Sequence, residues 1–102
     1  MTPIEKDIEK ALGRMIGRFG GRCLKWVCPG WSGVPDRICL LPGGRVIFIE
    51  TKRPVGATVA ARQKAWQRIL QDLGFDARII KSPQDISNLE NELWRDRDAK
   101  CN

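Results

Sequence analysis

The stretch GVPDRICLLPGGRVIFIETKRP, residues 33–54, decides how this chain folds and where its chemistry lies. Two apolar runs, Asp36–Leu41 and Arg45–Lys52, flank the turn sequence Pro42-Gly43-Gly44, a pattern typical of a β-hairpin. Both faces of the second run are apolar up to Ile49, as in a central strand that is covered on each side. The hairpin therefore predicts the middle of a sheet.

The second run ends in an acid and a base, Glu50 and Lys52, which share a face because strand side chains alternate. The turn joins the far ends of the two strands, so Asp36 returns to lie beside Glu50. Buried charges are costly unless they are paired or bind a metal. Two carboxylates and an ammonium at one edge of a core therefore predict a Mg²⁺ or Mn²⁺ site that hydrolyses phosphodiesters. The alternative is a surface ion pair between Glu50 and Lys52, with Asp36 an ordinary turn residue. The combination with the hairpin favours the catalytic interpretation.

The rest of the chain predicts helices and strands around this hairpin, and we find no second domain. Thr2 is expected to cap the first helix, with Glu5 in place for a capping box, and Thr58 to cap the second. The second helix carries Val59, Trp66, Ile69, Leu70 and Leu73 as its apolar residues. The other expected elements are a first helix ending at Gly20-Gly21, strands over Arg22–Cys28 and Asp76–Ile80, a linker over 53–57, a second helix ending at Gly74 and a last helix from Ser82-Pro83 that frays into the charged tail 95–102. The order α-β-β-β-α-β-α predicts one α/β domain over residues 1–102, with a mixed four-stranded sheet.

The charge and composition narrow the class of protein. Lys and Arg total 18 against 12 acids, and the net charge of +6 favours a polyanionic partner such as nucleic acid. The absence of histidine excludes His-based catalysis and His metal ligands. The four cysteines lack C-x-x-C spacing and are expected to stay reduced. No signal peptide or membrane span is predicted, which indicates a cytoplasmic protein of a prokaryotic or phage-infected cell.

Pro35-Asp36, followed after a hairpin by Glu50-Thr51-Lys52, resembles the motif of the PD-(D/E)XK nuclease superfamily. The segments CLKWVCPGWSGVPDRICLLPGGRVIFIETKRP and RQKAWQRILQDLGF resemble its VRR-NUC branch, and the resemblance runs from Glu5 to about Leu89. It implies an αβββαβ restriction-endonuclease-like core and metal-dependent cleavage of DNA. It also implies that Asp36 and Glu50 are metal ligands and that Lys52 is the catalytic lysine.

The same resemblance implies two further polar residues at the site. Relatives place a glutamate of the first helix there, and both Glu5 and Glu9 compete for this role. Glu5 lies nearer the centre of the apolar stripe and is the one we expect to bind metal, although it is also the expected capping partner of Thr2. Gln63 matches a glutamine near the metal site of VRR-NUC relatives; the alternative is a glutamine at the stripe edge that reaches water.

Basic and aromatic residues near the motif are candidates for DNA contacts. They are Arg37, Arg53, Arg62, Lys64, Arg68 and, in the loop before Asp36, Trp31, which could stack on a base or join a subunit interface. No base-reading element is present, so we expect recognition of branched DNA by shape. Small stand-alone nucleases resembling Holliday-junction resolvases act as homodimers, which the resemblance implies here. The competing hypotheses are a non-catalytic DNA-binding or assembly module and an RNA-binding basic protein.

Overall fold

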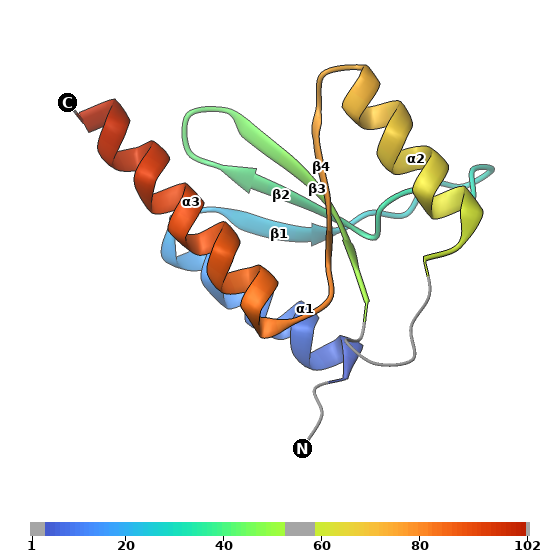
Figure 1. The fold of residues 1–102 in the computed structure, drawn as a ribbon, viewed down its shortest axis with the longest axis horizontal. Helices are drawn as coiled ribbons and strands as arrows, with labels where there is room; N and C mark the ends of the chain where they lie inside the picture. Colours follow the sequence, from blue (N-terminus) through green and yellow to red (C-terminus); the bar gives the residue numbers. More distant parts are fainter. Residues whose placement is uncertain (1–3, 53–58, 102) are drawn as a thin grey trace.

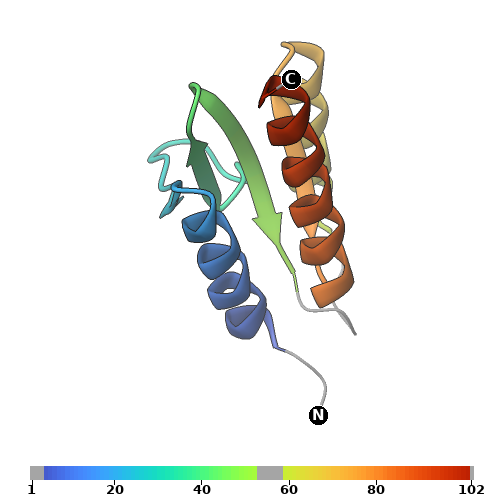
Figure 2. The ribbon, with the colours of Figure 1, turned by 90° about the vertical axis from the view of Figure 1, so that its left-hand side faces the viewer.

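The computed structural model describes residues 4–52 and 59–101, which form a four-stranded sheet with helices packed against it (Figures 1 and 2). The strands lie in the order β1-β2-β3-β4. The first two pairings are antiparallel and β3 pairs with β4 in parallel, so the predicted mixed sheet and fold class are confirmed. The elements are α1 (Glu5–Arg18), β1 (Arg22–Lys25), β2 (Arg37–Leu41), β3 (Arg45–Thr51), α2 (Ala61–Asp72), β4 (Asp76–Ile80) and α3 (Pro83–Cys101).

Helices α1 and α3 cover one face of the sheet and enclose the core with it. The apolar side chains of α1 recur three or four residues apart, so they form a single stripe that is fully buried. Each such side chain stabilises the fold by about 1.5–3 kcal/mol. The buried core consists of Ile8, Leu12, Met15, Ile16 and Phe19 of α1 and its C-cap, Cys39, Ile47, Ile49 and Ile80 of the sheet, and Ile86, Leu89 and Leu93 of α3.

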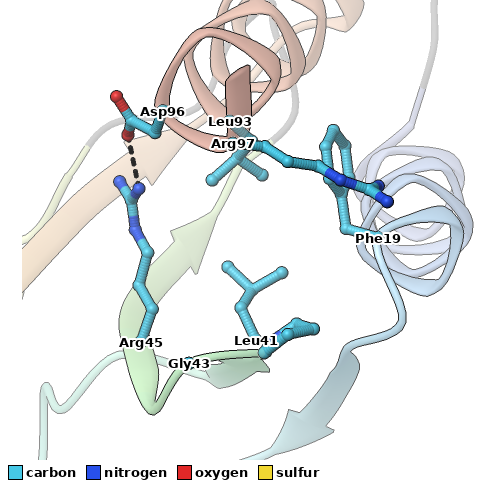
Figure 3. A pocket seen from close by; sticks show the side chains of 8 residues that line it. Phe19, Leu41, Gly43, Arg45, Leu93, Asp96 and Arg97 are labelled. Carbon is cyan, nitrogen blue, oxygen red and sulfur yellow. Dashed lines mark hydrogen bonds and ion pairs between the residues drawn. The ribbon is translucent and has the colours of Figure 1, made fainter. Parts of the chain in front are cut away.

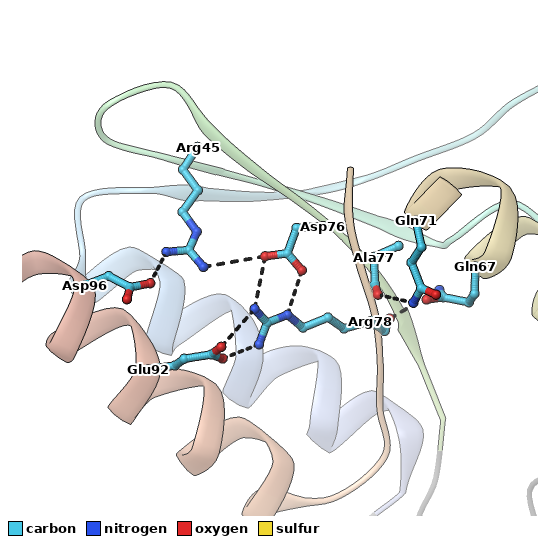
Figure 4. A network of polar contacts seen from close by, with 8 residues as sticks. All are labelled: Arg45, Gln67, Gln71, Asp76, Ala77, Arg78, Glu92 and Asp96. Carbon is cyan, nitrogen blue, oxygen red and sulfur yellow. Dashed lines mark hydrogen bonds and ion pairs between the residues drawn. The ribbon is translucent and has the colours of Figure 1, made fainter. Parts of the chain in front are cut away.

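Helix α2 packs beside β4 through polar side chains, which corrects the predicted apolar face. Its buried residues are Gln67 and Leu70, whereas Ile69 and Leu73 are exposed. Gln67 Nε2 donates to the carbonyl oxygen of Arg78 at 3.3 Å, and Gln71 Nε2 donates to that of Ala77 at 3.1 Å (Figure 4). Strand β4 lies at the edge of the sheet, and these amides bond its backbone carbonyls, which an apolar helix face could not do.

Helix α3 continues to Cys101, so the prediction of a frayed tail from residue 95 is wrong. Contacts with the sheet and α1 hold its second half. The Arg45 guanidinium bonds the Asp96 carboxylate, and Arg78 bonds both Asp76 and Glu92 (Figure 4). The Trp94 ring lies against the Phe19 ring, with centroids 4.7 Å apart.

A pocket of about 330 Å³ lies between the β2–β3 turn, the C-terminal end of α1 and α3. Phe19, Leu41, Leu93 and Arg97 line it, together with the Arg45–Asp96 pair (Figure 3). The turn is the end of the hairpin opposite to Asp36 and Glu50. The pocket is therefore separate from the predicted site.

Several predicted boundaries shift. Strand β1 ends at Lys25 instead of Cys28. The N–H of Ile4, the residue before α1, bonds Asp7 Oδ2 at 3.3 Å, so Asp7 takes the capping role expected of Glu5. Thr2, Thr58 and the linker 53–57 lie outside the described residues. Helix α2 begins after Ala60.

Two further findings concern the cysteines and the helices of the described residues. Cys23, Cys28 and Cys39 are free thiols. No helix described by the structure is long and apolar enough to cross a membrane.

Candidate active site

The β2–β3 register brings the two predicted carboxylates to the same end of the hairpin. Arg37 is paired with Ile49, so Asp36, one residue before β2, comes opposite Glu50 near the end of β3. The pairing is set by the turn at 42–44, which joins the strands at their other end. Glu50 therefore lies near the end of a central, largely apolar strand, with only 4% of its surface exposed.

Glu50 has one paired and one unpaired carboxylate oxygen. Its Oε1 accepts a hydrogen bond from Gln63 Nε2 at 2.9 Å and lies 3.5 Å from Lys52 Nζ. Its Oε2 is buried and has no hydrogen-bond partner among the described residues. Burial first, and then the charge of Asp36, raise the pKa of Glu50 from 4.5 to about 7, while the nearby Lys52 ammonium lowers it. A buried oxygen without a partner is a site where a cation or a proton is favoured.

Helix α1 adds two more carboxylates, because Glu5 and Glu9 are one helical turn apart and both face Asp36. Each of the three residues offers an oxygen within 4.8 Å of the others. Glu9 Oε2 accepts a hydrogen bond from Arg37 Nη2 at 2.8 Å. The Glu5 side chain has no hydrogen bond or ion pair within residues 4–52 and 59–101.

Asp36 itself is held by Thr51, the residue between Glu50 and Lys52. The Thr51 N–H donates to Asp36 Oδ1 at 3.1 Å, and the Thr51 hydroxyl donates to Oδ2 at 2.7 Å. Residue alternation along β3 puts Thr51 on the face opposite to Glu50, and the motif by itself assigns Thr51 no role. The signal was available: a hydroxyl stands in a strand whose other buried residues on that face are apolar.

Gln63 reaches Glu50 from the first turn of α2. Its Oε1 accepts the N–H of Ala60 at 3.1 Å, while its Nε2 donates to Glu50. Both ends of the amide are therefore used, and they anchor the start of α2 to the carboxylate. The alternative, in which Gln63 only reaches water, does not describe this geometry.

The donor set fits a hard divalent cation. Carboxylate oxygens of Asp36, Glu5 and Glu9 lie within 4.8 Å of one another. Glu50, whose Oε2 is unpaired among the described residues, belongs to the same group of charges, because besides burial the charges of Asp36 and Glu5 raise its pKa. Mg²⁺ and Mn²⁺ prefer oxygen ligands of this type.

Comparison with known proteins identifies a shared fold and a related sequence. A solved structure described as "VRR_NUC domain" has the same fold, with a TM-score of 0.79 over 83% of this chain and 91% of that chain, at 24% identity. No protein-family model matches the chain. The chain is 36% identical over 85 residues to "Putative nuclease p44" of Acyrthosiphon pisum secondary endosymbiont phage 1, covering 83% of this chain and 89% of the phage protein. The chain belongs to the family of this phage protein and has the VRR-NUC fold.

The loop before Asp36 in this VRR-NUC protein docks onto α2, next to Gln63. Ser32 accepts two bonds: its hydroxyl from Arg62 Nη1 at 2.6 Å and its carbonyl from Trp66 Nε1 at 3.1 Å. Trp31 is 64% exposed and contacts the Trp66 ring edge to face, with centroids 5.8 Å apart. Trp66 is three residues after Gln63 and hence its neighbour on the helix surface. A pair of aromatic rings, of which Trp31 is exposed and Trp66 half-buried, thus lies beside the contact of Gln63 with Glu50.

The other residues predicted to contact DNA differ in their exposure and in whether an acidic side chain already pairs with them. Lys64 is exposed on α2. Arg37 is half-buried and paired with Glu9, and Arg68 is paired with Asp72 at 3.1 Å. Arg53 lies outside the described residues.

Proposed function

We propose that this VRR-NUC nuclease is a Mg²⁺- or Mn²⁺-dependent endonuclease that hydrolyses phosphodiester bonds of branched DNA. The observation that carries the proposal is the buried Oε2 of Glu50, which has no hydrogen-bond partner among the described residues. The carboxylate cluster of Glu5, Glu9 and Asp36 and the Lys52 ammonium complete the site.

Asp36, Glu50 and Glu5 are the residues that would hold the cation. Glu5 is preferred to Glu9 because the Glu9 charge is already balanced by Arg37. When bound, Mg²⁺ or Mn²⁺ polarises the phosphodiester and lowers the pKa of water at the site.

Lys52 supplies the positive charge on the protein side of the reaction. Its ammonium, 3.5 Å from Glu50 Oε1, is only 18% exposed in its side chain. From there it would orient the attacking water or stabilise the negative charge that develops on the phosphoryl oxygens. Gln63 keeps Glu50 in place through Oε1, which leaves Oε2 free for the cation.

Arg62, Lys64 and Trp31 are the DNA contacts best supported by their exposure. The arginine and lysine would bind phosphates and fix register, while the Trp31 ring would stack on an unpaired base at a branch. Arg53 is proposed as a phosphate contact from its place after the motif. Arg37 and Arg68 would serve only after giving up their acidic partners.

We also propose that the protein acts as a homodimer, each subunit cutting one strand of a four-way junction. Leu24 of β1 and Leu40 of β2 support this, since they are large apolar side chains that are 47% and 41% exposed. The phage relative supports a site of action in the cytoplasm of a prokaryotic or phage-infected cell.

The test is cleavage of an end-labelled four-way DNA junction with Mg²⁺ or Mn²⁺, with duplex and flap DNA alongside. Asp36→Asn and a chelator control should abolish cleavage, whereas Asp98→Asn, a change of an exposed carboxylate on α3, should leave it intact. Paired symmetric cuts in the junction support a dimeric resolvase. Cuts confined to flaps or ends retain the nuclease and exclude the resolvase. Binding without cleavage in either metal indicates a non-catalytic module.

A further inference from the structure

We infer that Thr51 is a positioning residue that holds the Asp36 carboxylate ready for the cation through its side-chain hydroxyl. The inference rests on the proposed function, because it assigns Asp36 to metal binding. It concerns a residue of β3 whose side chain does not itself belong to the acidic cluster.

The geometry is a clamp made by one residue on both oxygens of one carboxylate. The Thr51 backbone N–H reaches Asp36 Oδ1 at 3.1 Å, and its hydroxyl reaches Oδ2 at 2.7 Å. Thr51 is fully buried, at 0% exposure, and lies in the rigid central strand. Two donors on a fixed backbone remove the rotation of the carboxylate. Each oxygen keeps a further lone pair that can accept a cation.

Counting protons shows which carboxylate the hydroxyl serves. A threonine hydroxyl has one proton to donate, yet two carboxylates face it: Asp36 Oδ2 at 2.7 Å and Glu9 Oε1 at 3.3 Å. The shorter contact takes the proton. Glu9 is held instead by Arg37, which bonds its other oxygen. Thr51 and Arg37 thus orient one carboxylate each, and Glu5 is left without such a partner among the described residues.

Packing alone does not account for a hydroxyl here. Valine has nearly the same shape and suits a buried strand position, and a buried hydroxyl costs free energy unless it is hydrogen-bonded. The hydroxyl bond to Asp36 supplies what valine lacks. Partners that orient metal ligands in this way typically change metal affinity or activity about 10- to 100-fold when removed.

The experiment measures Mn²⁺ binding to the DNA-free protein, from the electron paramagnetic resonance signal of free Mn²⁺. Thr51→Val removes the hydroxyl but keeps the backbone N–H and the shape, while Thr51→Ser keeps the hydroxyl. We expect Thr51→Val to weaken Mn²⁺ binding about 10- to 100-fold. Thr51→Ser should stay within about threefold of wild type, since its hydroxyl can make the same bond. The Mn²⁺ concentration for half-maximal junction cleavage should rise in parallel for Thr51→Val, with the rate recovering at high Mn²⁺.

Equal Mn²⁺ affinity in Thr51→Val and wild type overturns the inference, as does equal weakening in the valine and serine variants. If Thr51→Val does not fold, as judged by circular dichroism with chelator present, Thr51→Ala against Thr51→Ser decides in the same way. A wild type that cleaves while Thr51→Val matches it in metal dependence refutes the positioning role alone. A wild type that neither binds Mn²⁺ nor cleaves refutes the proposed function as well.

Discussion

Replacing Glu50 by glutamine should stabilise the metal-free protein at high pH while abolishing its activity. Glu50 has a pKa of about 7 in the folded protein, raised first by burial and second by the charge of Asp36, against an ordinary 4.5. Between these two values the folded state binds more protons than the unfolded state, so stability falls as pH rises. At about 1.4 kcal/mol per pH unit, the ionised carboxylate costs up to about 3 kcal/mol above pH 7 and nothing below pH 4.5.

Glutamine removes this cost and still accepts the Gln63 amide through its Oε1. We therefore expect Glu50→Gln to exceed wild type by about 2–3 kcal/mol in free energy of unfolding at pH 8 with chelator, and by much less at pH 5. Urea unfolding curves at several pH values measure the difference. Glu90→Gln is the matched control, because Glu90 forms a more exposed ion pair with Arg18 and its loss should change stability by about 0.5 kcal/mol or less at every pH.

Saturating Mg²⁺ or Mn²⁺ at pH 8 should reverse the order, since a ligand that binds only the folded state stabilises wild type and not the variant. A Glu50→Gln protein that is no more stable than wild type at pH 8, or whose advantage is the same at all pH values, would refute the reasoning about this buried charge.

Three further outcomes test the proposed site. Lys52→Ala should lower the cleavage rate at least about 100-fold while junction binding, measured by fluorescence anisotropy, changes little; unchanged cleavage would exclude Lys52 from the chemistry. Asp36→Asn should tighten metal-free binding of DNA about fivefold, because a charge that repels phosphate by about 1 kcal/mol is removed, and weaker binding in gel shifts would contradict this. Trp31→Ala should weaken binding of a junction about tenfold but that of intact duplex much less, whereas Trp31→Phe retains the stacking face. Equal losses on both DNAs, or a loss of self-association in sedimentation, would instead place Trp31 at a phosphate contact or at a subunit interface.

The local amino-acid sequence by itself determined the hairpin and the residues at its end. Turn residues at 42–44 and a strand apolar on both faces predict the pairing of β2 with β3, and the pairing places Asp36 next to Glu50 by simple register. Lys52 follows two residues on. None of this requires knowledge of what covers the sheet, so it could be deduced from the sequence.

Contacts between distant segments were decided only by the tertiary structure. Glu9 lies 42 residues before Thr51 and 28 before Arg37, and only the packing of α1 on the sheet brings them together. Helical phase alone therefore favoured Glu5 over Glu9, although both reach Asp36. The clamp of Thr51 on Asp36 also depends on how the Asp36 side chain turns at the end of β2, which residue alternation does not specify.

Hydrophobic periodicity also mispredicted the buried face of α2 and the extent of α3, and the reason is physical. It reports which residues a helix could bury, and the neighbouring elements decide which of them are buried. Helix α2 meets an edge strand whose backbone carbonyls accept hydrogen bonds from its glutamines, so Gln67 is buried while Leu73 remains exposed. Helix α3 stays helical past residue 95 because Asp96 meets Arg45 from the sheet. The sequence thus determines the β2–β3 hairpin through local pairing, while the packing of helices across it selects the residues that complete the candidate site.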